Sequence, residues 1–255
     1  MNLLETVHLK KYFGETHAVD DVNLVIVEGE FISLVGPNGA GKTSLVNVVS
    51  AYLKPDSGKV LFRGEDVTHA SVTDRVKVGI ARSFQIVNLF DDLTAFDNVA
   101  LAIFSRQGKT TNLMALAHLD RDVTAEADHV LAQFNLSTKR NELARDLAQG
   151  ERKLLDVALA YALRPKLLFL DEPTSGVSTR DKDQIMDTIA SVVRGERITA
   201  VIVEHDMDVV FKYSDRIVVM HQGAILAQGT PEKIRKNEQV AMILIGSADA
   251  FARKD

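Results

Sequence analysis

Residues 30–53 read EFISLVGPNGAGKTSLVNVVSAYL and combine three features that decide the fold. The apolar run FISLV is typical of a strand buried in a parallel sheet. A glycine-rich loop follows that satisfies the pattern G-x-x-x-x-G-K-[ST], and helical apolar spacing then begins. A strand, this loop and a helix in that order predict a phosphate-binding loop in an α/β protein. The candidate binding residues are Gly36, Pro37, Asn38, Gly39, Ala40, Gly41, Lys42, Thr43 and Ser44.

The residue types of this loop suit a nucleotide phosphate. Glycines allow successive backbone N–H groups to turn toward an anion, and the N-terminus of the following helix adds a partial positive charge. We expect Lys42 to reach the β- and γ-phosphates and the Thr43 hydroxyl to bind Mg²⁺. A second Gly-Lys-Thr, in RQGKTTN at 106–112, lacks the first glycine of the pattern because Ile103 stands there. We interpret that segment as a loop.

Two carboxylates follow a second strand-like run, LLFL at 167–170. Ligands of open α/β sheets bind at the carboxyl ends of the strands, where Asp171 and Glu172 would lie. We expect Asp171 to hold Mg²⁺, through water, and Glu172 to polarise the attacking water. Because adjacent strand residues point to opposite faces, the two carboxylates can serve different atoms.

Two further polar residues also follow apolar, strand-like runs. Gln85 ends the run at 80–84, and its amide can bind Mg²⁺ or orient water without adding charge. His205 ends the run ITAVIVEH and is expected to reach a γ-phosphate from the side opposite Lys42. Neither residue is diagnostic alone, but their order and their positions at strand ends support a nucleotide-hydrolysing site.

The overall composition excludes several classes of protein. The chain has 255 residues and no cysteine, which excludes a disulfide framework and thiolate metal sites. No apolar run approaches the roughly 18 residues of a membrane span, and the start of the chain does not resemble a signal peptide. The net charge of −5 argues against binding to nucleic acid. A soluble, intracellular globular protein is predicted.

Local patterns predict how the chain is organised. Helical apolar spacing recurs at 94–104, 122–134 and 150–163, whereas β-rich runs joined by turns occupy 4–10, 22–27 and 59–64. A helical subdomain inserted into the core and a small N-terminal antiparallel sheet are therefore expected. We predict one nucleotide-binding domain at 1–240, with its core at 1–86 and 166–240, its helical subdomain at 87–165, and a tail at 241–255.

In this order the motifs resemble the ATP-binding-cassette (ABC) ATPases over nearly the whole chain: Walker A at 36–43, Q-loop Gln85, signature at 147–151, Walker B at 167–172 and switch His205. The resemblance implies a P-loop fold with a RecA-like core, and ATP and Mg²⁺ as cofactors. It also implies that cassettes pair head to tail, so that the signature of one closes over the γ-phosphate held by the other. The corresponding residues are Ala148, Gln149, Gly150 and Glu151.

The family also uses an aromatic residue near the N-terminus to stack on adenine. Within LKKYFGETHAVDDVNL, Phe13 aligns with this role and Tyr12 is the near alternative. Stacking of a base on an aromatic ring contributes about 1–3 kcal/mol.

Within the family the chain resembles the ATPases of branched-chain (hydrophobic) amino-acid importers, in the segments 81–99, 201–237 and 239–247. The ATPases of lipopolysaccharide export have nearly the same layout and remain the alternative. The resemblance implies a second ABC ATPase subunit, identical or not, two transmembrane permease subunits and, indirectly, an extracytoplasmic solute-binding protein. The chain would then lie at the cytoplasmic face of the inner membrane, with a permease helix in a groove near Gln85 and 86–96.

Three positions depart from the family pattern. Ala148 stands where the signature serine would donate to a phosphate, Gln149 replaces the first signature glycine, and Ser178 replaces an aspartate that usually follows Walker B. We therefore hypothesise a non-identical partner cassette with a better-preserved signature.

Other functions fit the sequence less well. ABC proteins of DNA repair need long coiled-coil insertions, for which 85–150 leaves no room, and those of ribosomes usually carry two cassettes. A P-loop kinase would leave the signature and His205 without a role.

Overall fold

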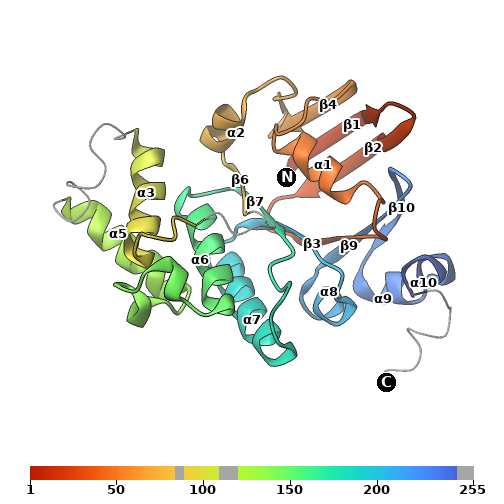
Figure 1. The fold of residues 1–255 in the computed structure, drawn as a ribbon. Coiled ribbons are helices and arrows are strands. Elements are labelled where there is room, and N and C mark those ends of the chain that lie inside the picture. Colours follow the sequence, from red (N-terminus) through yellow and green to blue (C-terminus); the bar gives the residue numbers. More distant parts are fainter. Residues whose placement is uncertain (84–88, 109–119, 246–255) are drawn as a thin grey trace. The chain divides into compact units, whose positions relative to one another are not determined.

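The computed structural model describes residues 1–83, 89–108 and 120–245, and Figure 1 draws the remaining segments as a grey trace. Gln85 and the end of the predicted tail, 246–255, lie outside the described residues. The chain divides into two compact units. Unit 1 comprises 1–75 and 199–255, and unit 2 comprises 76–198.

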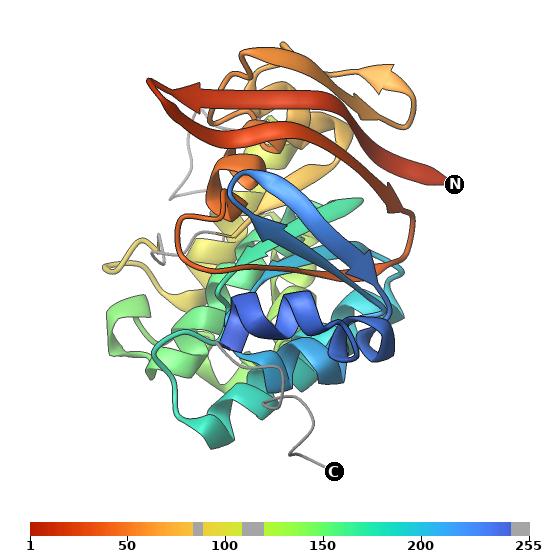
Figure 2. The same cartoon turned by 90° about the vertical axis from the view of Figure 1, so that its right-hand side faces the viewer.

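Unit 1 contains the N-terminal antiparallel sheet that the sequence predicts. Its strands are β1 (Asn2–Phe13), β2 (Thr16–Val27), β4 (Ser57–Phe62) and β5 (Glu65–Asp66), in the order β2-β1-β4-β5. Figures 1 and 2 show β1 and β2 as a long hairpin with β4 beside β1. Along β2 the buried residues Val22, Leu24 and Ile26 alternate with exposed ones, so that one face of the sheet packs on the core.

A mostly parallel set of strands in unit 1 carries the predicted loop. These strands are β3 (Phe31–Val35), β8 (Thr199–Val203), β9 (Arg216–His221) and β10 (Ala224–Gly229), in the order β10-β9-β3-β8. β3 is parallel to β8 and β9, and β10 pairs antiparallel with β9. Every residue of β3 and β8 is buried, which explains their mostly apolar sequences.

Short helices complete unit 1. They are α1 (Lys42–Val49), α8 (Met207–Tyr213), α9 (Pro231–Arg235) and α10 (Glu238–Ile245), while α2 (Val72–Val78) joins the two units along the chain. One core cluster collects residues from the strands and from the C-terminal helices: Val35, Val210, Ile217, Val219, Ile234 and Val240.

Unit 2 contains a parallel strand pair and most of the long helices. β6 (Ile80–Arg82) pairs with β7 (Leu167–Asp171). The helices are α3 (Ala95–Gln107), α5 (Arg121–Gln133), α6 (Gln149–Ala162) and α7 (Thr179–Gly195), with short 3-10 turns at Ser137–Lys139 and Ala144–Asp146. α3, α5 and α6 contact one another and lie within the segment 87–165 that is predicted to be helical.

Local sequence explains where α3 begins and ends. Thr94 caps its N-terminus by accepting from Asp97 N–H at 3.0 Å, and the Asp97 carboxylate accepts in return from Thr94. Gly108, in the left-handed conformation, ends it.

In the described part of the chain no helix combines the length and apolar character needed to cross a bilayer.

Candidate nucleotide-binding site

The phosphate-binding loop connects β3 to α1, as the sequence predicts, and two of its glycines are required by close backbone contacts. A Cβ on Gly36 would lie 2.3 Å from the Met220 carbonyl oxygen, and one on Gly41 would lie 2.0 Å from that of Ala18. Both glycines also have positive φ, at 152° and 100°. The loop is therefore packed against β9 and β2, a constraint that the motif itself does not reveal.

Lys42 is the first residue of α1, and its ammonium lies inside this loop. The side chain is buried, and Nζ donates to the carbonyl oxygens of Gly36 at 2.7 Å and Pro37 at 3.0 Å. Thr43, exposed, and Ser44, half-buried, follow in the first turn. α1 has no side-chain cap and no acidic residue in its first turn. The loop thus offers an ammonium and an uncompensated helix N-terminus to an anion.

The two candidate aromatic residues lie in different surroundings. The Tyr12 ring stacks on His17, with 4.1 Å between ring centroids, and its hydroxyl donates to Asp20 at 2.6 Å. The pKa of Tyr12 is raised to about 12, and this hydrogen bond is the largest cause. The Phe13 side chain is 51% exposed, with the Lys11 ammonium 5.5 Å from its ring centroid. Phe13 is therefore the better placed to receive a flat ring.

His205 lies between β8 and α8, where the sequence places it, and is exposed. Its backbone N–H donates to the Glu204 carboxylate at 3.2 Å. Glu204 is buried, and the motifs of the sequence do not include it. Its position directly after five buried strand residues, still inside the apolar run, was the available signal.

Asp171 and Glu172 have distinct environments at the end of β7. Asp171 is 3% exposed, and its carboxylate accepts a hydrogen bond from Arg82 Nη2 at 2.7 Å. Arg82, the last residue of β6, is a partner that the sequence motifs do not predict. Glu172 has a φ of 48°, in the left-handed region that non-glycine residues adopt at a cost of about 1–3 kcal/mol. Such strain concentrates at functional sites.

The signature segment forms the start of α6, at Gln149. Its N-cap residue Ala148 supplies no side-chain hydrogen bond, and the Glu151 carboxylate instead accepts from Ala148 N–H at 2.9 Å. Gly150 is half-buried, and a Cβ there would lie 3.4 Å from Ile185 of α7. Ser178, at the third departing position, accepts from Asp181 N–H at 3.3 Å and so caps α7.

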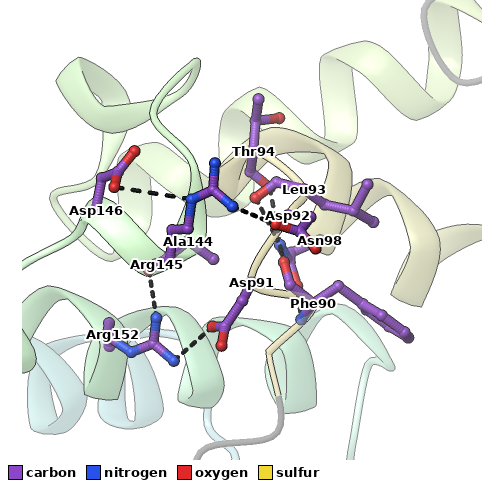
Figure 3. A network of polar contacts seen from close by, with 10 residues as sticks. All are labelled: Phe90, Asp91, Asp92, Leu93, Thr94, Asn98, Ala144, Arg145, Asp146 and Arg152. Carbon is purple, nitrogen blue, oxygen red and sulfur yellow. Dashed lines mark hydrogen bonds and ion pairs between the residues drawn. The ribbon is translucent and has the colours of Figure 1, made fainter.

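A polar network fastens this helix to the segment that follows 84–88 in the chain (Figure 3). Arg152 of α6 donates to the Ala144 carbonyl at 2.6 Å and to the Asp91 carboxylate at 2.7 Å. Arg145 pairs with Asp92 in the same network. Asn98 of α3 holds the Phe90 backbone through both its amide oxygen and its amide nitrogen. The start of α6 and the segment 90–94 are thus connected directly.

The structure distributes the predicted site residues between the two units. Unit 1 contains Phe13, 36–44 and His205, and unit 2 contains Asp171, Glu172 and 148–151. Among the described residues no three His, Asp or Glu side chains cluster as a metal site would need. A magnesium–nucleotide site does not need such a cluster, because phosphate and water supply most ligands. The hard oxygens of Thr43 and Asp171 fit that ion.

Comparison with known proteins identifies the family. The model of the ABC transporter family matches residues 19–175. The chain is 35% identical to the "High-affinity branched-chain amino acid transport ATP-binding protein BraF" of Pseudomonas aeruginosa, over 96% of this chain and 98% of that one. It is 34% identical to the corresponding protein LivG of Escherichia coli K12, with the same shares covered.

Solved structures agree with this result. The ADP conformation of an ATP-binding cassette of an ABC transporter superposes with a TM-score of 0.84 at 30% identity, covering 97% of this chain and all of that one. A dimeric post-hydrolysis cassette bound to ADP and Pi superposes with a TM-score of 0.76 at 26% identity, covering 90% of this chain and 99% of that one. The chain therefore belongs to the ABC transporter family and is an ATP-binding, ATP-hydrolysing subunit of such a transporter.

Proposed function

We propose that this subunit powers the import of branched-chain or other hydrophobic amino acids. The observation that carries the proposal is the similarity, over 96% of the chain, to two ATPases named for branched-chain amino-acid transport. ATPases of lipopolysaccharide export are the alternative that the shared motifs leave open.

In this proposal one ATP binds through the residues of the predicted motifs. The backbone of 36–41 and the Lys42 ammonium hold the phosphates, and Phe13 stacks on the adenine. Thr43, Asp171 and Gln85 would hold Mg²⁺, which neutralises charge on the phosphates when it is bound. The Arg82 guanidinium donates to one oxygen of the Asp171 carboxylate and would orient that carboxylate toward the metal-bound water.

Glu172 and His205 would act on the terminal phosphate. Glu172 accepts a proton from the attacking water, and His205 donates a hydrogen bond to the γ-phosphate as charge develops. Catalysis in this arrangement is mainly positioning and charge stabilisation, because phosphoryl transfer requires little covalent chemistry from the protein.

We further propose that a second cassette completes the site. The dimeric relative supports a dimer, and residues 148–151 would then face the nucleotide held by the partner subunit. Two permease subunits would bind near 86–96, with an extracytoplasmic solute-binding protein beyond them and this chain at the cytoplasmic face of the inner membrane. The hydrogen bond between Asp91 and Arg152 joins the predicted permease-binding segment to the helix that begins with the signature (Figure 3).

The catalytic part is tested by Glu172→Gln, which keeps the size of the side chain but removes its basicity. We expect ATP affinity within about twofold of wild type, hydrolysis lowered at least about 100-fold, and a stable ATP-bound dimer. Binding is measured with a fluorescent ATP analogue, and dimerisation by size-exclusion chromatography. Hydrolysis at the wild-type rate would exclude Glu172 as the base.

The substrate is tested separately, by uptake of radiolabelled leucine into cells that express the complete transporter. Loss of uptake in the Glu172→Gln strain supports the proposal. Unchanged leucine uptake, with loss of another transported solute, would contradict it.

A further inference from the structure

Lys153 is a buried lysine on α6 whose role the motifs do not explain. It is 6% exposed, and its Nζ donates to the carbonyl oxygen of Glu172 at 3.2 Å and to Ser175 Oγ at 3.1 Å. Both acceptors are uncharged. Burying an ammonium is unfavourable unless its donors are satisfied, so packing alone does not account for a lysine here.

The carbonyl that Lys153 contacts belongs to the proposed catalytic residue. The same oxygen also accepts from Ser175 N–H at 3.1 Å, so that two donors hold one peptide group. This peptide group follows the left-handed Cα of Glu172, with its φ of 48°. Because carbonyl and side chain share that Cα, fixing the carbonyl restricts where the carboxylate can point.

A second side chain on the same face of α6 contacts the same segment. Gln149 lies one helical turn before Lys153, and such residues are neighbours on a helix surface. A Cβ built on Gly176 would lie 2.5 Å from Gln149 Nε2, so this amide packs against the Gly176 backbone. The helix that begins with the signature is therefore connected at two points to the segment that follows Asp171.

We propose that Lys153 is a positioning residue that transmits the position of α6 to Glu172. The inference rests on the proposed function, in which α6 begins at the partner's nucleotide and Glu172 acts on the nucleotide of its own chain. Lys153 then connects the two ATP sites of the dimer. Engagement of α6 at one site holds the carboxylate of Glu172 in place at the other.

The first test is Lys153→Met, which keeps the apolar stem but removes the ammonium, in the full-length chain within its assembled transporter. We expect kcat for ATP hydrolysis to fall about tenfold, or ~1.4 kcal/mol. KM for ATP should stay within about twofold, because the phosphate-binding loop is unchanged. Lys153→Arg, which retains donors, should recover part of the rate. The control Lys59→Met removes an exposed lysine of the N-terminal sheet and should leave kcat unchanged.

The second test repeats Lys153→Met in the Glu172→Gln background, with single-turnover rates. A residue that acts through Glu172 should cause no further loss there. The proposal would be overturned if Lys153→Met lowered the rate of ATP hydrolysis by the same factor in the wild-type and Glu172→Gln backgrounds. A wild-type kcat for the Lys153→Met single variant would also overturn it. If Lys153→Met does not fold, as judged by its melting curve, Ser175→Ala removes one acceptor and should show a smaller, equally non-additive loss. A failure of the proposed function would be recognised separately, because the Glu172→Gln single variant would then hydrolyse ATP at the wild-type rate.

Discussion

Lys42 illustrates how one side chain combines a structural and a binding role. Its ammonium is buried, yet two loop carbonyls accept from it, which offsets the cost of removing the charge from water. A bound phosphate would compete for the same ammonium and form a stronger, charge-assisted hydrogen bond. The lysine is thus held inside the loop before nucleotide arrives.

Lys42→Ala should therefore weaken ATP binding more than it affects folding. Loss of a hydrogen bond to a charged group is worth about 1.5–3 kcal/mol, so we expect Kd to rise roughly 10- to 150-fold. Isothermal titration calorimetry measures the affinity, and a thermal melt checks the fold. An unchanged Kd in a folded protein would show that Lys42 does not contact the phosphates.

At the level of elements, Arg75 binds the carboxyl-terminal end of α1, the helix that follows the phosphate-binding loop. Arg75 is 1% exposed and donates to the carbonyls of Val48 at 2.7 Å and Val49, near the end of α1. It also donates to the carbonyls of Val67 at 2.8 Å and Thr68 at 3.0 Å. Burial lowers its pKa to about 10, so the group stays charged at neutral pH. The last turn of α1 is thereby fixed by a residue of α2.

Replacing this guanidinium should destabilise unit 1. Arg75→Met leaves buried carbonyls without their donor, and we expect the free energy of unfolding to fall by about 2–4 kcal/mol. Urea denaturation of the variant measures the change. Arg63→Met, which removes an exposed arginine paired with Glu28, is the control and should change stability by less than about 1 kcal/mol. Equal effects of the two substitutions would contradict this account.

A second connection between elements joins the three packed helices of unit 2. Arg106, at the end of α3, donates to both carboxylate oxygens of Glu126 at 2.8 and 2.7 Å and to the Ala162 carbonyl of α6 at 2.6 Å. Arg164 also pairs with Glu126 at 2.8 Å. The hydrogen bonds from Arg106 are the main cause that holds the pKa of Glu126 below its ordinary value.

This shift predicts a pH dependence of stability. Because the folded-state pKa of Glu126 is lowered, its contribution is present above the ordinary pKa of about 4.3 and is lost as pH falls through the folded-state value. Glu126→Gln should lower the melting temperature at pH 7, and the difference from wild type should shrink toward pH 3. Glu15→Gln, at an exposed position, is the control. A difference that is the same at both pH values would refute the ionic origin.

At the scale of the whole molecule, the signature predicts an unequal dimer. Ala148 has no hydroxyl to donate to a phosphate oxygen, and such a bond is worth about 1.5–3 kcal/mol. Both sites of a homodimer would lack it, whereas a partner with a serine would restore it at the P-loop of this chain. We expect at least about tenfold higher ATP turnover from a mixed pair than from this chain alone. Ala148→Ser should raise the ATP turnover of the chain alone. If the unsubstituted chain alone hydrolysed ATP as fast as the mixed pair, the hypothesis would be wrong.

The sequence by itself was sufficient for the parts of this protein that depend on neighbouring residues. The phosphate-binding loop, the flanking strand and helix, and the N-terminal antiparallel sheet follow from local spacing, because dihedral preferences and burial patterns act over a few residues. The family follows from the order of such local motifs. The predicted domain boundaries and the roles of all the predicted site residues stay predictions.

The tertiary structure alone decided which side chains support the motif residues. Arg82 meets Asp171, and Lys153 meets the Glu172 carbonyl. Packing against β9 and β2, rather than anion binding alone, accounts for Gly36 and Gly41. None of these features has a local signature, because a buried polar residue is defined by a partner that folding brings from elsewhere in the chain.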